Sequence, residues 1–357
     1  MNNYIPFLKF KINEIAALAS LTPELQAKTY PFLDFAKKKG MSEASFLTMI
    51  AKARIAFNRH LKNFPAVFLD NFDIDDSIKL AGRENYSAVI EAFGEYEKFV
   101  PVIGLDRPED RNDLVFRAKA AGLISSSTIA LRLQPEDFQS FAVVEDEILE
   151  FQRRGAGLFN HWTIVLDNRF CAGVDSASRI NQINNFLANA SGKVNMNAVI
   201  VAGSSLPASI SELMKVLTDI HHPRHEISIY RGVVAAAQHP SIYLGDYTVV
   251  SPLYSDLDIP AEAMQNVIAA KTIYSHGDVH YIVRGGALKT HARKRLQYND
   301  IAGRIVAQVF YRGPGYSAGD LYLDEKARFI GSGITPGSIL KPTINAHINY
   351  MFKGFLG

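Results

Sequence analysis

Short apolar runs recur along the first 205 residues, and almost all of them end in a charged residue. The residues that end the first six runs are Lys9, Asp34, Asp70, Asp106, Arg132 and Asp167. A seventh run, 197–205, ends in two serines, and successive ends lie 25 to 37 residues apart. Most runs are apolar throughout rather than alternating, as expected for strands buried on both faces. The pattern predicts repeated strand–helix units around a parallel sheet.

The segments between the runs carry helical periodicity. After Ser42, apolar residues recur near every 3.6 positions at Phe46, Ile50, Ala53 and Phe57, which predicts a helix that begins at Ser42. Further helices are expected over 12–21, after Pro108, after Pro135, over 205–220 and over 226–237.

An eighth strand is expected at Asp246–Pro252. Eight parallel strands with intervening helices satisfy an α/β fold of the (β/α)8 TIM-like barrel type over residues 1–253. An open doubly wound sheet more often has a glycine-rich first turn, and residues 9–12 contain no glycine. The barrel is therefore the favoured fold.

Residues 254–357 depart from the strand–helix pattern. Residues 271–274 and 279–284 flank a turn and predict a hairpin. A basic helix over 290–311, a small strand after Asp320 and a terminal helix over 345–355 are expected to follow. Because no linker-like composition precedes this segment, we expect a C-terminal extension packed on the barrel.

Composition excludes several classes of protein. The chain has 357 residues, 48% of them hydrophobic and 21% charged, which is ordinary for a soluble domain. A formal charge of +2 does not by itself favour nucleic acid or membrane as a partner. The single cysteine, Cys171, rules out an internal disulfide framework and fits a reducing compartment. With neither a signal peptide nor an apolar window of about 18 residues, a cytoplasmic protein is expected.

Polar side chains at the carboxyl ends of barrel strands gather at one mouth, where such folds bind ligands. The residues expected to line a ligand-binding site there are Lys9, Asp34, Asp70, Asp106, Arg132, Asp167, Asp246 and Arg284. Four of the carboxylates, with a lysine and an arginine, could hold a divalent cation, bind a phosphorylated ligand, or supply an acid and a base. They could equally pair into salt bridges. The pattern identifies no catalytic residue, no metal ligand and no certain cofactor.

A second cluster of charge surrounds Arg293, Lys294 and Arg295, with Lys289 before it and Arg304 after it. Such a cluster can contact phosphate groups of a nucleic acid, although a solvated helix face is the more common explanation.

Several short motifs occur together in a characteristic order. They are Tyr4–Lys9 with Glu14, Ala202–Ser205, Pro223–Glu226, Gly245–Tyr247, Arg284–Gly285 and Ser317–Asp320. Through them the chain resembles the beta protein family of phages, satellite phages and bacterial defence islands. It departs from the family pattern at Ala318, where an aromatic residue is usual. It also departs at Lys341–Pro342, in place of a Trp-Arg pair, and at Asn345–His347, in place of paired histidines.

The resemblance implies a single barrel-like domain that acts in phage–host or inter-phage conflict beside a toxin or nuclease-like protein encoded nearby. It supplies no catalytic residues. Our leading hypothesis is an antiviral-defence protein that recognises a small ligand, a peptide or a partner protein at the barrel mouth. The alternatives are a metal-assisted hydrolase or phosphodiesterase that uses the strand-end aspartates, and a nucleic-acid-binding component.

Overall fold

The computed structural model describes residues 4–236, 239, 241–253 and 268–355. The chain divides into two units, each assembled from several separate segments. The first unit consists of Met1–Phe10, Ala27–Ser204 and His225–Tyr247. The second consists of Lys11–Gln26, Ser205–Arg224 and Thr248–Gly357.

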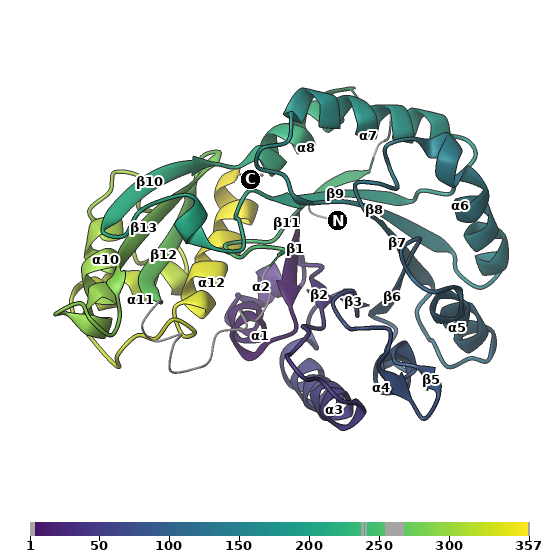
Figure 1. The fold of residues 1–357 in the computed structure, drawn as a ribbon, viewed down its shortest axis with the longest axis horizontal. Coiled ribbons are helices and arrows are strands. Elements are labelled where there is room, and N and C mark those ends of the chain that lie inside the picture. Colours follow the sequence, from purple (N-terminus) through teal and green to yellow (C-terminus); the bar gives the residue numbers. More distant parts are fainter. Residues whose placement is uncertain (1–3, 237–238, 240, 254–267, 356–357) are drawn as a thin grey trace. The chain divides into compact units, whose positions relative to one another are not determined.

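The first unit contains a closed barrel of eight parallel strands (Figure 1). Its strands are β1 (Tyr4–Lys9), β2 (Phe32–Asp34), β3 (Val67–Asp70), β6 (Phe99–Gly104), β7 (Thr128–Leu133), β8 (His161–Phe170), β9 (Ala198–Ser204) and β11 (Ile242–Asp246). Their order around the barrel is β1-β11-β9-β8-β7-β6-β3-β2. The predicted (β/α)8 TIM-like fold is confirmed.

Helices surround these strands (Figure 1). Those of the first unit are α3 (Glu43–His60), α4 (Tyr86–Phe93), α5 (Glu109–Ala120), α6 (Phe141–Gly155), α7 (Ser176–Ala190) and α8 (His225–Ala236). Helix α3 begins as predicted, because the Ser42 side chain accepts a hydrogen bond from the backbone N–H of Ser45. Its buried residues are the four that the periodicity selected. A two-stranded hairpin, β4 (Lys79–Leu80) with β5 (Arg83–Glu84), precedes α4.

The barrel interior holds an aromatic layer directly below a layer of charge. The rings of Phe7 and Phe32 stack with centroids 4.4 Å apart, and Phe68 continues the row at 5.5 Å from Phe32. Side chains on a strand alternate between its two faces, so the residue two positions later points into the barrel again. Those later positions are Lys9, Asp34 and Asp70, and the same rule places Arg132 and Asp167 above Ala130 and Val165 of the apolar cluster.

Three predicted elements between residues 135 and 252 differ from the structure. The eighth strand is Ile242–Asp246 rather than 246–252. Gly245 lies within this strand and packs closely against neighbouring side chains. A side chain at Gly245 would meet Phe7, Ala202 and Ile200 within 3.0 Å. Helix α6 begins at Phe141, since Pro135–Asp137 lies in the loop before it. Helix α8 makes the crossover between β9 and β11, and the predicted helix over 205–220 is wrong.

The segment that replaces this helix is part of the second unit. It contains a 3-10 turn at Ile210–Glu212 and strand β10 (Thr218–Pro223). Leu217 has a left-handed backbone (φ 62°), which ends any helix at that point. Strand β10 then pairs antiparallel with β13 (Val279–Ala287), so that sheet pairing outweighs the helical apolar spacing.

The second unit combines this sheet with helices. The order of the sheet is β10-β13-β12, and β12 (Ala269–His276) forms the predicted hairpin with β13. Its helices are α1 (Ile12–Ala19), α2 (Pro23–Gln26), α10 (Gln297–Val306), α11 (Ala318–Ala327) and α12 (Leu340–Tyr350), which continues as a π-helical turn at Met351–Phe355. The predicted helix over 290–311 is shorter at both ends, and the small strand expected after Asp320 is replaced by α11.

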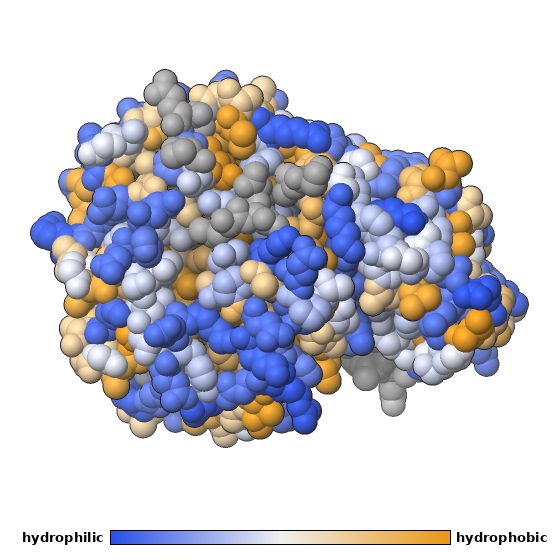
Figure 2. Space-filling model, turned by 180° about the vertical axis from the view of Figure 1, so that it is seen from behind, coloured by the Kyte–Doolittle hydropathy of each residue, from blue (hydrophilic) through white to orange (hydrophobic). Residues whose placement is uncertain are grey.

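The described helices do not form a bilayer-spanning segment, since none combines sufficient length with sufficient apolar character. On the face that Figure 2 shows, hydrophobic residues are interspersed with hydrophilic ones. Large exposed apolar side chains such as Ile12, Val143 and Val309 come from different elements. Scattered exposure of this kind is normal for a protein surface.

The Ser-x-Gly-Asp motif has a packing explanation in the second unit. Ser317 caps α11 by accepting a hydrogen bond from the Asp320 N–H at 3.0 Å. The N–H of Gly319 donates to Asn345 Oδ1 of α12 at 3.0 Å. A Cβ atom at Gly319 would lie 2.1 Å from the carbonyl oxygen of Pro342, so only glycine allows α11 and α12 this close.

Gly319→Ala is therefore expected to destabilise the protein by about 1–3 kcal/mol, since the backbone of α12 must move. Gly303→Ala in α10 is the matched control, because a Cβ atom there meets nothing within 4 Å. It should stabilise the helix by up to about 1 kcal/mol. Urea denaturation of both variants measures the difference, and equal midpoints would contradict the packing explanation.

Candidate functional site

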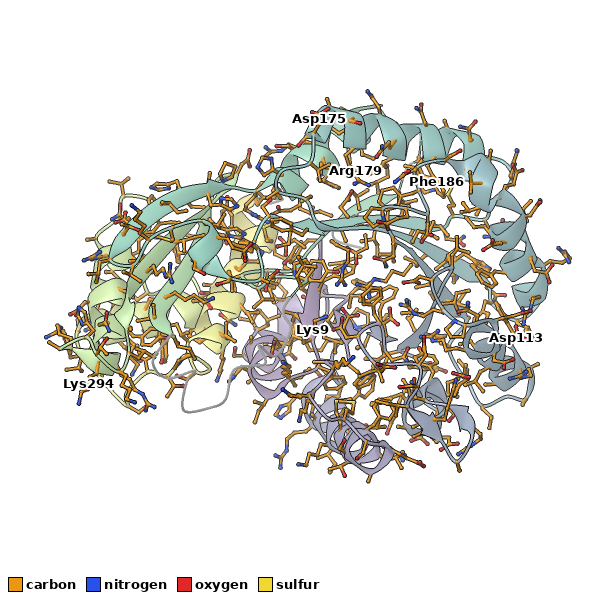
Figure 3. All side chains as sticks on the ribbon, in the orientation of Figure 1. Lys9, Asp113, Asp175, Arg179, Phe186 and Lys294 are labelled. Carbon is orange, nitrogen blue, oxygen red and sulfur yellow. The ribbon has the colours of Figure 1, made fainter. Side chains whose placement is uncertain are left out.

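Five barrel strands each deliver one charged side chain to the layer above the aromatic residues. These side chains are Lys9, Asp34, Asp70, Arg132 and Asp167, and all are buried. Figure 3 shows Lys9 among the barrel strands. The charges thus lie beneath the surface of the mouth, where a low dielectric makes an unpaired charge expensive.

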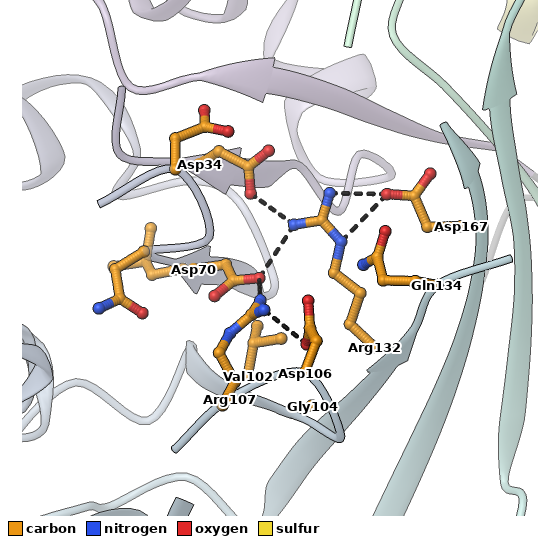
Figure 4. A network of polar contacts seen from close by, with 12 residues as sticks. Asp34, Asp70, Val102, Gly104, Asp106, Arg107, Arg132, Gln134 and Asp167 are labelled. Atoms are coloured by element: carbon orange, nitrogen blue, oxygen red, sulfur yellow. Dashed lines mark hydrogen bonds and ion pairs between the residues drawn. The ribbon is translucent and has the colours of Figure 1, made fainter. Parts of the chain in front are cut away.

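Arg132 occupies the centre of this layer (Figure 4). Its Nη1 donates to Asp34 Oδ1 at 2.8 Å and to Asp70 Oδ2 at 2.9 Å. Its Nη2 and Nε both donate to Asp167 Oδ2, at 2.6 and 3.1 Å. Nη2 also contacts the hydroxyl oxygen of Tyr247 at 2.9 Å. One guanidinium group therefore joins carboxylates from three different strands.

Further cations complete the pairing of these carboxylates. Lys9 Nζ lies 3.1 Å from Asp34 Oδ2 and 2.5 Å from Asp73 Oδ2. Asp70 is also paired with Arg107 at 2.8 Å and with the fully buried Arg111 at 3.3 Å. Every carboxylate that meets Arg132 thus has a second polar partner.

Asp106 lies at the edge of the same arrangement. It forms an ion pair with Arg107 at 2.6 Å, and its side chain is 30% exposed. With Arg169, whose charge acts on Asp34 and Asp167, the group contains five cations and five carboxylates and is formally neutral. We call it the charge network; its members are Lys9, Arg107, Arg111, Arg132, Arg169, Asp34, Asp70, Asp73, Asp106 and Asp167.

The pairing sets the protonation states of the network. Burial alone would raise the pKa of Asp34, but the charges of Arg132 and Lys9 outweigh burial and hold that pKa well below its usual range. Burial and the neighbouring Asp167 carboxylate raise the pKa of the Tyr247 hydroxyl well above its usual value. Tyr247 therefore keeps its proton, and its hydroxyl donates a hydrogen bond to Asp167 Oδ2 at 2.6 Å.

A partly exposed layer lies over the network at the mouth. The guanidinium carbons of Arg107, Arg132 and Arg169 lie 4.8, 4.6 and 4.3 Å from the centroid of the Phe72 ring. Arg169 has a left-handed backbone (φ 54°), and its N–H donates to Asp167 Oδ1 at 2.9 Å. We call the partly exposed residues of this layer the rim; they are Phe72, Asp73, Asp106, Arg107 and Arg169.

Two buried donors beside the rim face no acceptor among the described residues. They are Arg107 Nε and Gln134 Nε2. Arg107 follows β6 and Gln134 follows the neighbouring strand β7, and both lie around Arg132 in Figure 4. A buried donor of this kind is satisfied by water or by a ligand that brings an acceptor.

Two predicted site residues lie outside the network. Gly245 of β11 faces Phe7 inside the barrel, so Asp246 lies on the opposite face of that strand. Its carboxylate accepts a hydrogen bond from the Tyr4 hydroxyl at 2.8 Å. Arg284 lies on β13 of the second unit, where its Nη1 donates to the carbonyl oxygen of Met214 at 2.5 Å. The structure brings the other six predicted residues together.

The residues that the sequence analysis missed come shortly after the predicted strand ends, although β8 itself continues past Arg169. Phe72 and Asp73 follow Asp70, Arg107 follows Asp106, and Arg169 follows Asp167 by two positions. Inspection of the two or three residues beyond each strand would have found them. Arg111, one helical turn after Arg107, carried no comparable signal. Tyr247 belonged to the Gly245–Tyr247 motif but was placed inside the misplaced eighth strand, 246–252.

The paired carboxylates do not suit a divalent cation. Their oxygens accept from guanidinium, ammonium or hydroxyl groups, so a metal ion would have to displace Arg132 or Lys9. Across the described ranges no group of three or more His, Cys, Asp or Glu side chains is placed to hold a metal. The geometry therefore favours a rigid ionic scaffold over the metal-assisted alternative.

Arg132→Met is expected to destabilise the protein by about 3–5 kcal/mol, because three buried carboxylates lose their shared cation. Arg132→Lys keeps the charge but cannot reach all three, so its loss should be smaller. Urea denaturation at pH 7 measures both. Arg59→Ala on the exposed end of α3 serves as the control and should stay within about 0.5 kcal/mol. An Arg132→Met protein as stable as this control would contradict the central role of Arg132.

The depressed pKa of Asp34 predicts a pH dependence of stability. Below about pH 4 the unfolded chain takes up a proton at Asp34, whereas the folded protein does not until a much lower pH. The stabilisation is therefore complete above about pH 4 and declines as the pH falls. Denaturation midpoints between pH 7 and pH 3 should fall less steeply for Asp34→Asn than for the unmodified protein. Parallel curves would show that Asp34 does not contribute.

Comparison with known proteins gives a family match that extends over nearly the whole chain. The family model described as Beta protein matches residues 4–353, and no curated protein matches the chain. The match begins at the first barrel strand and ends in the π-helical turn after α12, so it includes segments of both units. Because it spans nearly the whole chain, the protein that carries this charge network belongs to the Beta protein family.

Proposed function

We propose that the protein is a recognition component in phage–host or inter-phage conflict and binds a ligand or a partner protein at the rim. The observation that carries the proposal is the convergence of three guanidinium groups, those of Arg107, Arg132 and Arg169, on the partly exposed residue Phe72 above the buried carboxylates. The association with conflict is what the resemblance to the beta protein family of phages, satellite phages and bacterial defence islands implies, and the match over residues 4–353 supports that resemblance.

The chemistry of the rim suits recognition better than a proton-transfer reaction. The network carboxylates are ion-paired, the pKa of Asp34 is depressed, and Tyr247 holds its proton, so neither Asp34 nor Tyr247 is poised to exchange a proton near neutral pH. Rigid side chains lose little entropy when a ligand binds, which favours affinity.

The rim also indicates which chemical groups a ligand would bring. Guanidinium groups bind carboxylate and phosphate oxygens, and an aromatic ring offers a flat apolar contact. Arg107 Nε and Gln134 Nε2 add donors that need an acceptor. A small ligand, or a segment of a partner protein, that carries an anionic or carbonyl group beside a planar apolar group would satisfy these features.

The test is a rim variant that leaves Arg132 and the three carboxylates that it contacts in place. Phe72→Ala with Arg169→Gln should keep a thermal unfolding midpoint close to that of the unmodified protein. It should lose co-purification with the protein encoded beside its gene, and protection against phage should fall at least about tenfold in plaque counts. Arg59→Ala, far from the rim on α3, should retain both properties.

Two results would overturn the proposal. One is a folded rim variant with unchanged partner binding and unchanged protection. The other is a rise in the thermal midpoint with Mg2+ or Mn2+ that Asp70→Asn abolishes, because preferential binding to the folded state would then indicate a metal site. The second result would favour the hydrolase or phosphodiesterase alternative.

A further inference from the structure

The turn between β13 and α10 concentrates positive charge. Residues 279–299 contain five lysines and arginines and no aspartate or glutamate. Four of these cations, Lys289, Arg293, Lys294 and Arg295, are exposed and precede the first residue of α10, Gln297. They lie in a turn and a short 3-10 helix (Lys294–Leu296), and so do not form the solvated helix face that the sequence suggested.

Three of these cations are available to a partner. In the part of the chain that the structure describes, no carboxylate is paired with Lys289, Lys294 or Arg295. Arg293 differs, because its Nε and Nη2 donate to both oxygens of Asp300 at 2.5 and 2.7 Å. This bidentate pair holds its guanidinium group in one orientation.

An exposed aromatic ring lies beside the oriented arginine. The guanidinium carbon of Arg293 is 5.9 Å from the centroid of Phe329, whose side chain is 55% exposed. Phe329 and Lys294 both have left-handed backbones, with φ of 60° and 44°. Such conformations are unfavourable for residues other than glycine and are found where the surrounding structure requires them. Here they present a ring and an ammonium group to solvent.

We infer that this surface binds single-stranded nucleic acid. Lys289, Lys294 and Arg295 would contact successive phosphates, while Phe329, supported by Arg293, would stack on an unpaired base. Exposed aromatic rings select single strands, because the bases of a duplex are already stacked. An anionic membrane fits less well, since its usual ligand is a continuous amphipathic helix and these cations lie in short turns.

The inference is tested by fluorescence anisotropy of the full-length protein with labelled 20-nucleotide poly(U) and poly(dT), from 50 to 200 mM NaCl. Three phosphate contacts predict a slope of about −2 in log K against log salt. Lys294→Gln with Arg295→Gln should make that slope less steep by about 1.4. Phe329→Ala should weaken binding about tenfold at every salt concentration and leave the slope unchanged.

The matched control removes the same charge elsewhere. Lys52→Gln with Arg59→Gln, both exposed on α3, should bind like the unmodified protein. No binding at 50 mM NaCl, or an equal loss in this control, would overturn the inference. If the protein binds no oligonucleotide but sediments with phosphatidylserine vesicles, the inference is overturned and the surface binds membranes instead. Since the rim belongs to the first unit, these outcomes leave the proposed function untouched.

Discussion

The barrel mouth depends on one interaction, the contact of the buried Arg132 guanidinium with three carboxylates. A guanidinium group removed from water is tolerated only when its donors meet acceptors, and Asp34, Asp70 and Asp167 provide them. Those carboxylates would in turn be costly without further donors, which come from Lys9, Arg107, Arg111 and Tyr247. The rim therefore rests on a set of side chains that must all be present together. That dependence makes the mouth rigid, and rigidity suits a surface that recognises rather than one that rearranges.

Much of this arrangement could be predicted from the sequence, because two simple rules determine it. Apolar runs of similar spacing indicate parallel strands, and the two-residue alternation on each strand places a charged residue above an inward-facing apolar one. Five of the eight predicted site residues meet for that reason, and Asp106 joins them from the loop after β6. Asp246 was expected at the mouth, but the alternation puts it on the other face of β11. Arg284 ends no barrel strand, since β13 pairs with β10 and β12 in the second unit.

The parts that could not be predicted depend on contacts between distant segments. The residues around Leu213 and Val216 have helical spacing, yet the neighbouring chain becomes a strand because β13 offers an edge to pair with. Arg111 is indistinguishable from any helical arginine until α5 packs beside β6 and its guanidinium group reaches Asp70. Phe72, Asp73 and Arg107 of the rim lie in loops, where no periodicity exists to be read. The Ser-x-Gly-Asp motif is a similar case, because its glycine acquires meaning only when α12 lies against it.

The division of the chain into interleaved segments has a consequence for biosynthesis. The second unit needs 11–26, 205–224 and everything from Thr248 onward, so its first helices leave the ribosome more than 200 residues before their partners in α12. The barrel is complete earlier, once β11 has joined β1. During translation α1 and α2 must therefore remain without α12 after the barrel strands are complete, and such long-range pairing slows folding and exposes the chain to aggregation. A cell producing this protein in quantity would then depend on chaperones until the last helix emerges.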